Sequence, residues 1–436
     1  MKLRLVLAAV LASGLLSFLL PVFHKAGSVS RAADGGPVVI ATIPVDGGSF
    51  GPVGVAVNPV TNRVYTANGL GSSVSIIDGA ANAIEGTVAL ASSPLAVAVE
   101  SSTNRVYTVG LNSNDVSVID GDTKTLVTTI PTEGLSPSWL DLDQTSNRLY
   151  TCNANSHDLS VIDSEINSWL AMVPFAADVR PSAVAVNPVS DRIYVANNSS
   201  SSFETLCSCI TFGTSCPCGN LPAGTSGSVH VVDGGTNTQI AAIPAGTGAD
   251  AIAVNPATNR VYAALSIWTS GETDYGIYVI DGVTNTVLTT IPLNGAPGGV
   301  AVNPVTNRIY VANYGDNSVS IIDGGSNAIV GSVSGGSGPF GVAVNPTTGH
   351  VYVTNPLNHT VTVIEDPALP PTATPTPHPV VGSVGGKVLV PPAALADASS
   401  EPSGPPDAMV GIWVGLATAT AVTAAVAGWH VVRRRS

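Results

Sequence analysis

The sequence predicts an all-β protein in which a short four-stranded sheet is repeated seven times around a closed ring. Three observations lead to this prediction. Apolar residues alternate with polar ones in runs rich in Val, Ile, Thr and Tyr, which is typical of strands. A unit of about 42 residues recurs along the chain. Gly and Pro supply 45 and 32 of the 436 residues, as expected of a protein with many turns.

Residues 297–338 show one complete unit. Alternating runs predict four strands, at residues 299–303, 308–312, 318–323 and 328–333. Asn-Pro, Thr-Asn and Asp-Gly-Gly separate the runs, and these residues favour turns. One such sheet cannot bury both of its faces alone, so neighbouring units must pack against each other.

Each unit carries a tyrosine in its second predicted strand, and seven such tyrosines mark seven units. An acidic residue ends the third strand, 13 positions after the tyrosine in five units, 39 in the fourth and 19 in the fifth. The extra length of the fourth and fifth units therefore falls between their second and third strands. The tyrosines are Tyr65, Tyr107, Tyr150, Tyr194, Tyr262, Tyr310 and Tyr352.

The seventh unit lacks a fourth strand, and the N-terminal region supplies one. Residues 37–44 match the pattern of a fourth strand and precede the first unit. If they pair with residues 360–365, the ring closes and two exposed sheet edges disappear. The prediction is a seven-bladed β-propeller over residues 37–365, with four antiparallel strands in each blade.

A recurring motif gives the chain a family resemblance. VAVNP-x-TNR-x-Y-VAN…VS-x-IDG is clearest in residues 55–79 and 300–324. This text resembles the repeat of YVTN-family β-propellers, which are surface-layer-type and YncE-like proteins. The resemblance implies an extracytoplasmic propeller that serves as a binding or cell-surface protein, with no agreed catalytic residues.

Both ends of the chain predict secretion and membrane attachment. Residues 1–32 read as a signal peptide, with an uncleaved anchor as the alternative. Residues 366–407 are rich in Pro, Thr, Ser and Ala and predict an extended stalk. Residues 408–432 hold no Lys, Arg, Asp or Glu and are long enough to span a bilayer. The basic residues 433–436 then belong in the cytoplasm, with the propeller outside the cell.

The predicted ring is strongly acidic. Residues 37–365 contain 8 Lys and Arg against 24 Asp and Glu, a balance of −16. Such a surface repels phosphate backbones, so we do not expect nucleic acid as a partner.

Four cysteines lie in the long insertion of the fourth unit. Outside the cytoplasm, paired cysteines in a Gly- and Pro-rich segment favour disulfides. Bonding within a Cys-x-Cys pair is strained, so we expect two bonds between the pairs. A tetrathiolate metal site and free reactive thiols are the alternatives. The cysteines are Cys207, Cys209, Cys216 and Cys218.

Departures from the repeat cluster in units three, four and five, on one end of the ring. Scaffold proteins tend to hold their sites where the repeat is broken, so these residues form the candidate ligand-binding face. The alternative is that the aromatic side chains pack on the insertions themselves. The candidates are Trp139, Asp141, His157, Phe203, Phe212, Trp268 and Tyr275.

Motifs of hydrolases, metalloproteases, phosphate-binding loops and EF-hands are missing from the sequence. The histidines of the ring fall at separate positions. We therefore expect a monomeric binding or scaffold protein without cofactor or metal, whose partner is a protein or glycan at the cell surface. Two alternatives stay open. One is an extracytoplasmic enzyme, such as a lactonase-like hydrolase or a redox protein with an ion in the channel; the other is a passive surface-coat protein.

Overall fold

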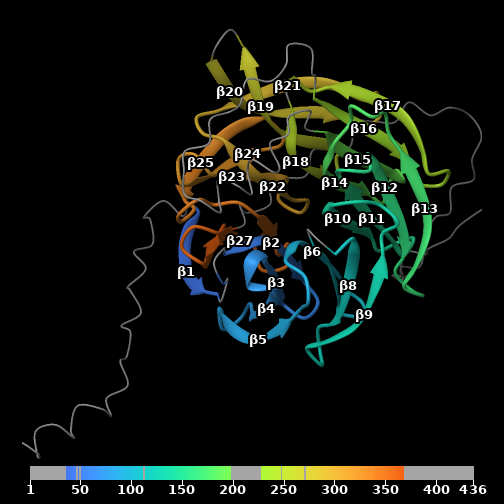
Figure 1. Cartoon of the computed structure of the whole chain (residues 1–436). Coiled ribbons are helices and arrows are strands. Elements are labelled where there is room, and N and C mark those ends of the chain that lie inside the picture. Colours follow the sequence, from blue (N-terminus) through green and yellow to red (C-terminus); the bar gives the residue numbers. More distant parts are fainter. Residues whose placement is uncertain are drawn as a thin grey trace, which may run out of the picture. The chain divides into compact units, whose positions relative to one another are not determined.

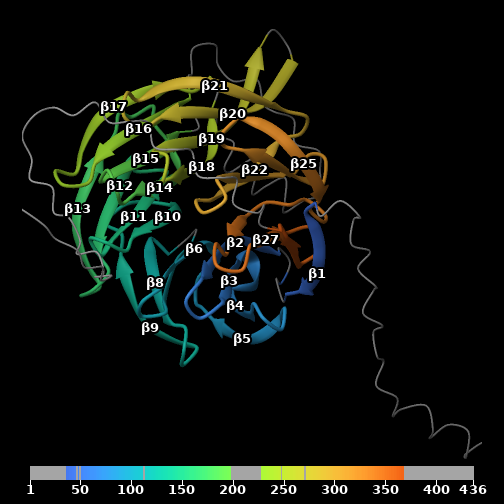
Figure 2. The ribbon, with the colours of Figure 1, turned by 180° about the vertical axis from the view of Figure 1, so that it is seen from behind.

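The computed structural model describes residues 36–45, 48, 51–110, 113–197, 227–246, 248–269 and 272–367, with the backbone alone for 266–269 and 272–274. These residues form seven four-stranded antiparallel sheets. In Figures 1 and 2 the colours run around a ring from the blue first blade to the orange seventh, and β2 lies beside β27. The predicted seven-bladed β-propeller is confirmed.

Each blade runs from an innermost strand to an outermost one, and blades follow chain order. The innermost strands are β2 (Pro52–Asn58), β6 (Pro94–Glu100), β10 (Pro137–Asp143), β14 (Pro181–Asn187), β18 (Ala249–Asn255), β22 (Pro297–Asn303) and β26 (Val342–Val344). The second strands are β3 (Arg63–Asn68), β7 (Arg105–Gly110), β11 (Arg148–Asn153), β15 (Arg192–Asn197), β19 (Arg260–Thr269), β23 (Arg308–Asn313) and β27 (His350–Asn355).

The third and fourth strands complete the blades. The third strands are β4 (Ser73–Asp78), β8 (Asp115–Asp120), β12 (Asp158–Asp163), β16 (Ser228–Asp233), β20 (Glu272–Asp281), β24 (Ser318–Asp323) and β28 (Thr360–Glu365). The outermost strands are β5 (Ala83–Ala89), β9 (Thr125–Pro131), β13 (Ser168–Pro174), β17 (Thr238–Pro244), β21 (Thr286–Leu293), β25 (Ala328–Ser334) and β1 (Val38–Pro44). A short 3₁₀ turn, η1 (Gly69–Gly71), joins β3 to β4.

The N-terminal strand closes the ring as predicted. β1 pairs antiparallel with β28, from Val38 opposite Glu365 to Pro44 opposite Thr360. The innermost strands β2 and β26 also contact each other, so the first blade packs against the seventh. Ile43 of β1 is buried in the core cluster that these two blades share.

The repeated tyrosine joins neighbouring blades. All seven tyrosine rings are fully buried between sheets. The Tyr65 hydroxyl donates to Asn104 Oδ1 in the next blade at 2.7 Å, and Asn58 Nδ2 donates to the same oxygen at 2.8 Å. A Cβ on Gly121 would lie 2.4 Å from the Tyr65 hydroxyl, which explains why glycine follows the aspartate in this turn.

The repeated aspartate and arginine are also scaffold residues. Asp78 Oδ1 accepts the N–H groups of Ala80 and Ala81 and so holds its own turn. Arg63 donates to both oxygens of Glu85 at 2.8 Å, and to Asp122 of the next blade at 2.7 Å. Repetition of these contacts serves the architecture, because each blade meets the same neighbour.

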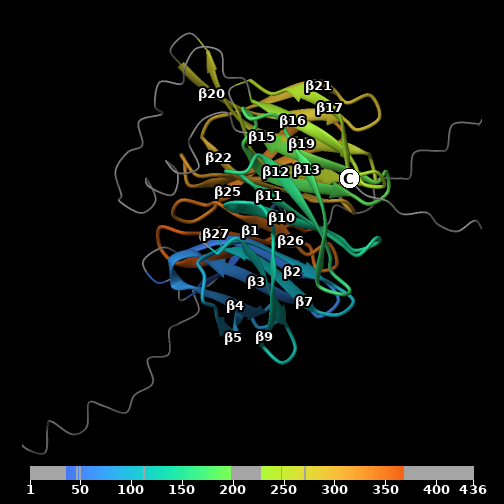
Figure 3. The same cartoon turned by 45° about the vertical axis from the view of Figure 1, so that its right-hand side comes forward.

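Two parts of the sequence prediction need separate comment. The predicted segments at the chain ends lie almost wholly outside the described residues, and the blade-5 insertion has a different structure from the one expected. The described residues include no helix with the length and hydropathy to cross a bilayer. The expected signal peptide (1–32), most of the stalk (366–407), the membrane segment (408–432) and the basic tail (433–436) lie outside the described part of the chain, apart from Asp366 and Pro367. The blade-5 insertion differs: β19 and β20 lengthen into a hairpin where a loop was expected (Figure 3).

Candidate functional site

Successive strands of each blade run in opposite directions, so the ring has two different ends. At one, which we call the turn end, short turns join first to second strands and third to fourth strands. At the other, the insertion end, loops join second to third strands and each outermost strand to the next blade. The long insertion after Asn197 and the β19–β20 hairpin both belong to the insertion end.

Trp139 lies on β10 near the insertion end of the ring. It packs against the cluster formed by Val53, Leu95 and Phe340, as does Tyr314. These five side chains, which we call the inner plug, come from blades 1, 2, 3, 6 and 7, so they converge toward the axis. Trp139 is therefore a partly buried packing residue. The other six inner strands hold only Gly or Ala at its position: Gly54, Ala96, Ala183, Ala251, Gly299 and, next to β26, Gly341.

Asp141 lies two residues further along β10, where the other inner strands carry Ala. Its Oδ1 accepts the N–H of Leu142 and its Oδ2 accepts the N–H of Val186 on β14, both at 2.8 Å. Burial raises the pKa of this carboxyl to about 6, more than these hydrogen bonds lower it. Asp141 thus links the inner edges of blades 3 and 4 and holds a proton more readily than an exposed aspartate.

His157 ends the loop between β11 and β12, also on blade 3. Its backbone adopts a left-handed conformation with φ of 61°, as Asn114, Asn317 and His359 do at the same position of other blades. Its Nδ1 lies 2.6 Å from the carbonyl oxygen of Val179. A carbonyl only accepts, so Nδ1 carries a hydrogen in this contact.

His230, which the sequence interpretation did not select, lies close to the same loop. The side chain is 5% exposed on β16, and its ring centroid is 5.1 Å from that of Phe175. Phe175 in turn donates its N–H to the His157 carbonyl at 2.8 Å. The two histidines therefore flank one segment, residues 175–180, although the sequence placed them at separate positions.

The environment of His230 keeps its imidazole neutral. Nε2 lies 2.8 Å from Ser228 Oγ, while Nδ1 is buried and makes no hydrogen bond. Burial lowers the pKa of the His230 imidazole. Gln239 acts against this shift, although the buried Nδ1 makes no hydrogen bond. One sequence signal could have found His230: five other blades carry Ser or Thr at this position, Ser75, Ser117, Ser160, Ser320 and Thr362.

The remaining candidates divide between blade 5 and undescribed segments. Tyr275 lies on β20 and packs, partly buried, against the core shared by blades 5 and 6. Trp268 belongs to β19 and pairs with Thr273, and its side chain lies outside the described residues. Six further predicted residues also lie outside the described part of the chain: Phe203, Phe212, Cys207, Cys209, Cys216 and Cys218.

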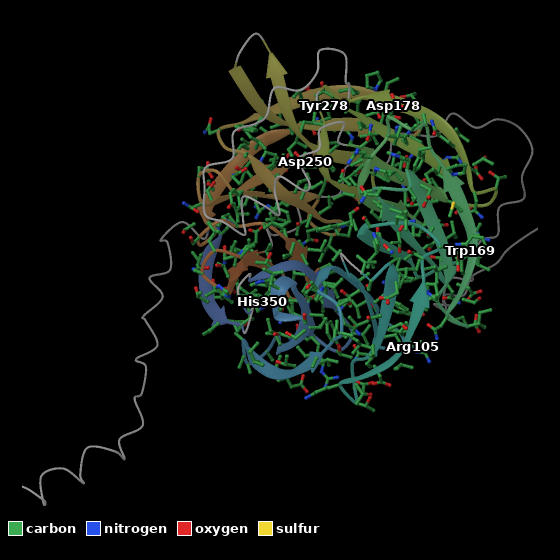
Figure 4. The ribbon with its side chains drawn as sticks, in the orientation of Figure 1. Arg105, Trp169, Asp178, Asp250, Tyr278 and His350 are labelled. Atoms are coloured by element: carbon green, nitrogen blue, oxygen red, sulfur yellow. The ribbon has the colours of Figure 1, made fainter. Side chains whose placement is uncertain are left out.

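The inner strands carry one sign of charge. Among their residues are four carboxyl groups and no Lys, Arg or His. Figure 4 shows Asp250 closer to the centre of the ring than Arg105 and Trp169, which lie toward its periphery. No group of three potential ligand side chains suited to a metal ion occurs among the described residues. The carboxyl groups are Glu100, Asp141, Asp143 and Asp250.

Comparison with protein-family models finds no match, and comparison with curated proteins finds none either. Solved structures do match. Hydrazine synthase from Kuenenia stuttgartiensis is similar over 73% of this chain and 96% of that chain, with a TM-score of 0.61 and 19% sequence identity. The likeness is one of fold. At 19% identity, the similarity supports the propeller architecture and gives no information about activity.

Proposed function

We propose that this chain is an extracytoplasmic binding protein, attached to the membrane by its C-terminal segment, whose ligand face is the insertion end of blades 3 to 5. One observation carries the proposal: the departures from a sevenfold scaffold gather on three neighbouring blades, and all of them except Asp141, which lies nearer the turn end of β10, fall toward that end. They are the inner-plug residue Trp139, Asp141, His157, His230 and the blade-5 hairpin.

The exit point of the chain supports the orientation. Glu365 ends β28 at the turn end, and the next residue, Asp366, is buried and accepts hydrogen bonds from Arg308 and the Tyr310 hydroxyl. The stalk and membrane segment proposed from the sequence would therefore leave from the turn end. The insertion end is at the other side of the ring from this exit point.

The proposed ligand is a protein or glycan at the cell surface. Imidazoles, carboxylates and partly buried aromatic side chains offer hydrogen bonds and stacking surfaces, which suit a polar, uncharged or cationic ligand. The acidic ring argues against a polyanion.

Shortening the blade-4 insertion tests the proposal. Residues 198–227 would be replaced by the four-residue turn of blade 6, residues 314–317, in the full-length protein. We expect binding to an array of glycans and cell-surface proteins to be lost, while far-ultraviolet circular dichroism stays unchanged. The matched control exchanges the blade-7 turn, residues 356–359, for the same four residues. Unchanged binding by the shortened protein would contradict the proposal.

A channel enzyme is the second candidate, and Asp141 is the observation that favours it. A half-buried carboxyl whose pKa is raised to about 6 is suited to proton transfer near neutral pH. Metal analysis of the purified protein, together with lactone hydrolysis by wild type and Asp141→Asn, would test this candidate. Hydrolysis that disappears in the variant would favour the enzyme over the binding protein.

A further inference from the structure

The outermost strand of every blade carries a β-bulge at the same place. In β13, Val161 pairs with Ala171 and Ile162 with Trp169, which leaves Leu170 as the extra residue. A bulge twists the edge and disrupts its hydrogen-bonding row, so these edges are protected from strand addition. The extra residues of the seven blades are Glu85, Val127, Leu170, Ile240, Leu288, Val330 and Ile40.

The outermost strand of blade 3 departs from the other six. Trp169 and Met172 are 41% and 37% exposed on β13. Where β13 has Met172, the other blades have Thr87, Thr129, Ala242, Thr290, Ser332 and Thr42. Where β13 has Trp169, they have Ile84, Leu126, Gln239, Val287, Ile329 and Val39. Nothing in the repeat requires larger apolar side chains here, and both are partly in water.

The apolar surface reaches the neighbouring blade. β9 of blade 2 contacts β13, and its Val127 is 49% exposed. Ile166 precedes β13 and is 68% exposed. Figure 4 shows Trp169 on the outer side of the ring. We name this surface the blade-3 strip: Val127, Ile166, Trp169, Leu170 and Met172.

Exposed acidic residues flank the blade-3 strip at both ends. Glu165 lies at its turn end, and Glu133 and Asp178 follow β9 and β13 at its insertion end. Arg180 is the exposed cation nearest in sequence to that end. Apolar surface framed by carboxylates is complementary to apolar side chains framed by Lys and Arg.

From this arrangement we infer that the blade-3 strip is a docking surface for a cationic amphipathic helix of another protein. The bulge in β13 excludes recognition by strand addition, whereas a helix docks through its side chains. A second copy of this chain would bring its own acidic flanks against Glu133, Glu165 and Asp178, and these charges repel. The apolar residues of the strip lie on the outer side of the ring and are not among the proposed ligand-face residues, so the strip would serve a second partner.

A labelled 18-residue helix of Leu and Lys, arranged with one apolar and one basic face, is the probe. Its counterpart with Glu in place of Lys is the charge control. We expect the full-length protein to bind the Lys peptide saturably and the Glu peptide at least tenfold more weakly. Trp169→Gln with Met172→Thr should weaken the Lys peptide at least tenfold. Both replacements are residues that other blades carry at these positions, so the fold should tolerate them.

Matched variants keep the test decisive. Ile329→Gln makes the equivalent change on blade 6 and should leave binding unchanged. Equal binding by the wild type and the blade-3 variants would overturn the inference. Self-association in sedimentation equilibrium that disappears in the Trp169 variant would assign the surface to a second copy. Quenching of Trp169 fluorescence by brominated lipids would assign it to a bilayer.

Discussion

Val38 lies opposite Glu365, the first and last residues of the strand pair that closes the ring. Because β1 and β28 are antiparallel, the chain enters β1 and leaves β28 at the same end, the turn end. The N-terminal region and the proposed tether therefore emerge side by side. Any load on the C-terminal segment would reach the ring at this strand pair and at Asp366.

Ile43→Ala should weaken this closure. Ile43 is 3% exposed and sits opposite Val361. Truncating a buried isoleucine to alanine lowers the free energy of unfolding by about 3 kcal/mol. Denaturant titration measures the loss, and hydrogen exchange should show faster exchange in β28. Thr42→Ala, on the exposed side of β1, is the control and should change little. Equal stability of the two variants would contradict closure by β1.

Tyr65→Phe should cost about 1 kcal/mol, because it removes one hydrogen bond to Asn104 and leaves the ring packed. Asn104→Ala should cost more, since Asn58 and Tyr65 both lose their acceptor and Asn104 has a φ of 54°. Denaturant titrations of the two single variants and the double variant measure the coupling. Strictly additive losses would show that the bond does not join the blades.

Asp141 makes the stability depend on pH in a defined direction. Its pKa is raised to about 6, so between its unfolded value and pH 6 the folded protein binds the proton more tightly. This contribution stabilises the fold at low pH and is lost as pH rises, by about 3 kcal/mol up to pH 7. Asp141→Asn should flatten the change in melting temperature between pH 4 and pH 7. A variant with the wild-type slope would contradict the argument.

The proposed extracytoplasmic location predicts which residues a membrane-impermeant reagent can reach from outside the cell. Leu357 lies at the insertion end and is 48% exposed. In intact cells, Leu357→Cys should react with a membrane-impermeant maleimide above the level of the wild-type protein. The matched variant replaces Ser436, which the proposal puts in the cytoplasm, and should react only after the cells are opened. Protection of both positions in intact cells would rule out an extracytoplasmic ring.

Periodicity predicted the fold because the ring is built from local patterns. Asn303, Tyr310 and Asp323 each recur at fixed spacings, and the structure gives each a repeated role in a turn or between blades. Ring closure was also predictable, since residues 37–44 carry the pattern that the seventh unit lacks.

The candidate site was only partly predictable, because alignment with the repeat shows which residues deviate but not what they contact. Trp139 deviates as an aromatic among small residues, yet it packs into the inner plug. His157 and His230 are 73 positions apart and meet only through the segment containing Phe175. The β19–β20 hairpin reads as a loop because its extra residues include Gly271 and Ser270 beside the alternating run.

One pair of substitutions tests the central claim most directly. His157 and His359 occupy the same position on blades 3 and 7, with φ of 61° and 56°, and blades 2 and 6 place Asn there. Full-length protein with His157→Asn or His359→Asn would be compared with the wild type on the glycan and surface-protein array. The account predicts at least a tenfold loss of binding for His157→Asn and none for His359→Asn. Equal binding by both variants would contradict the claim that the departures on blades 3 to 5 form the ligand face.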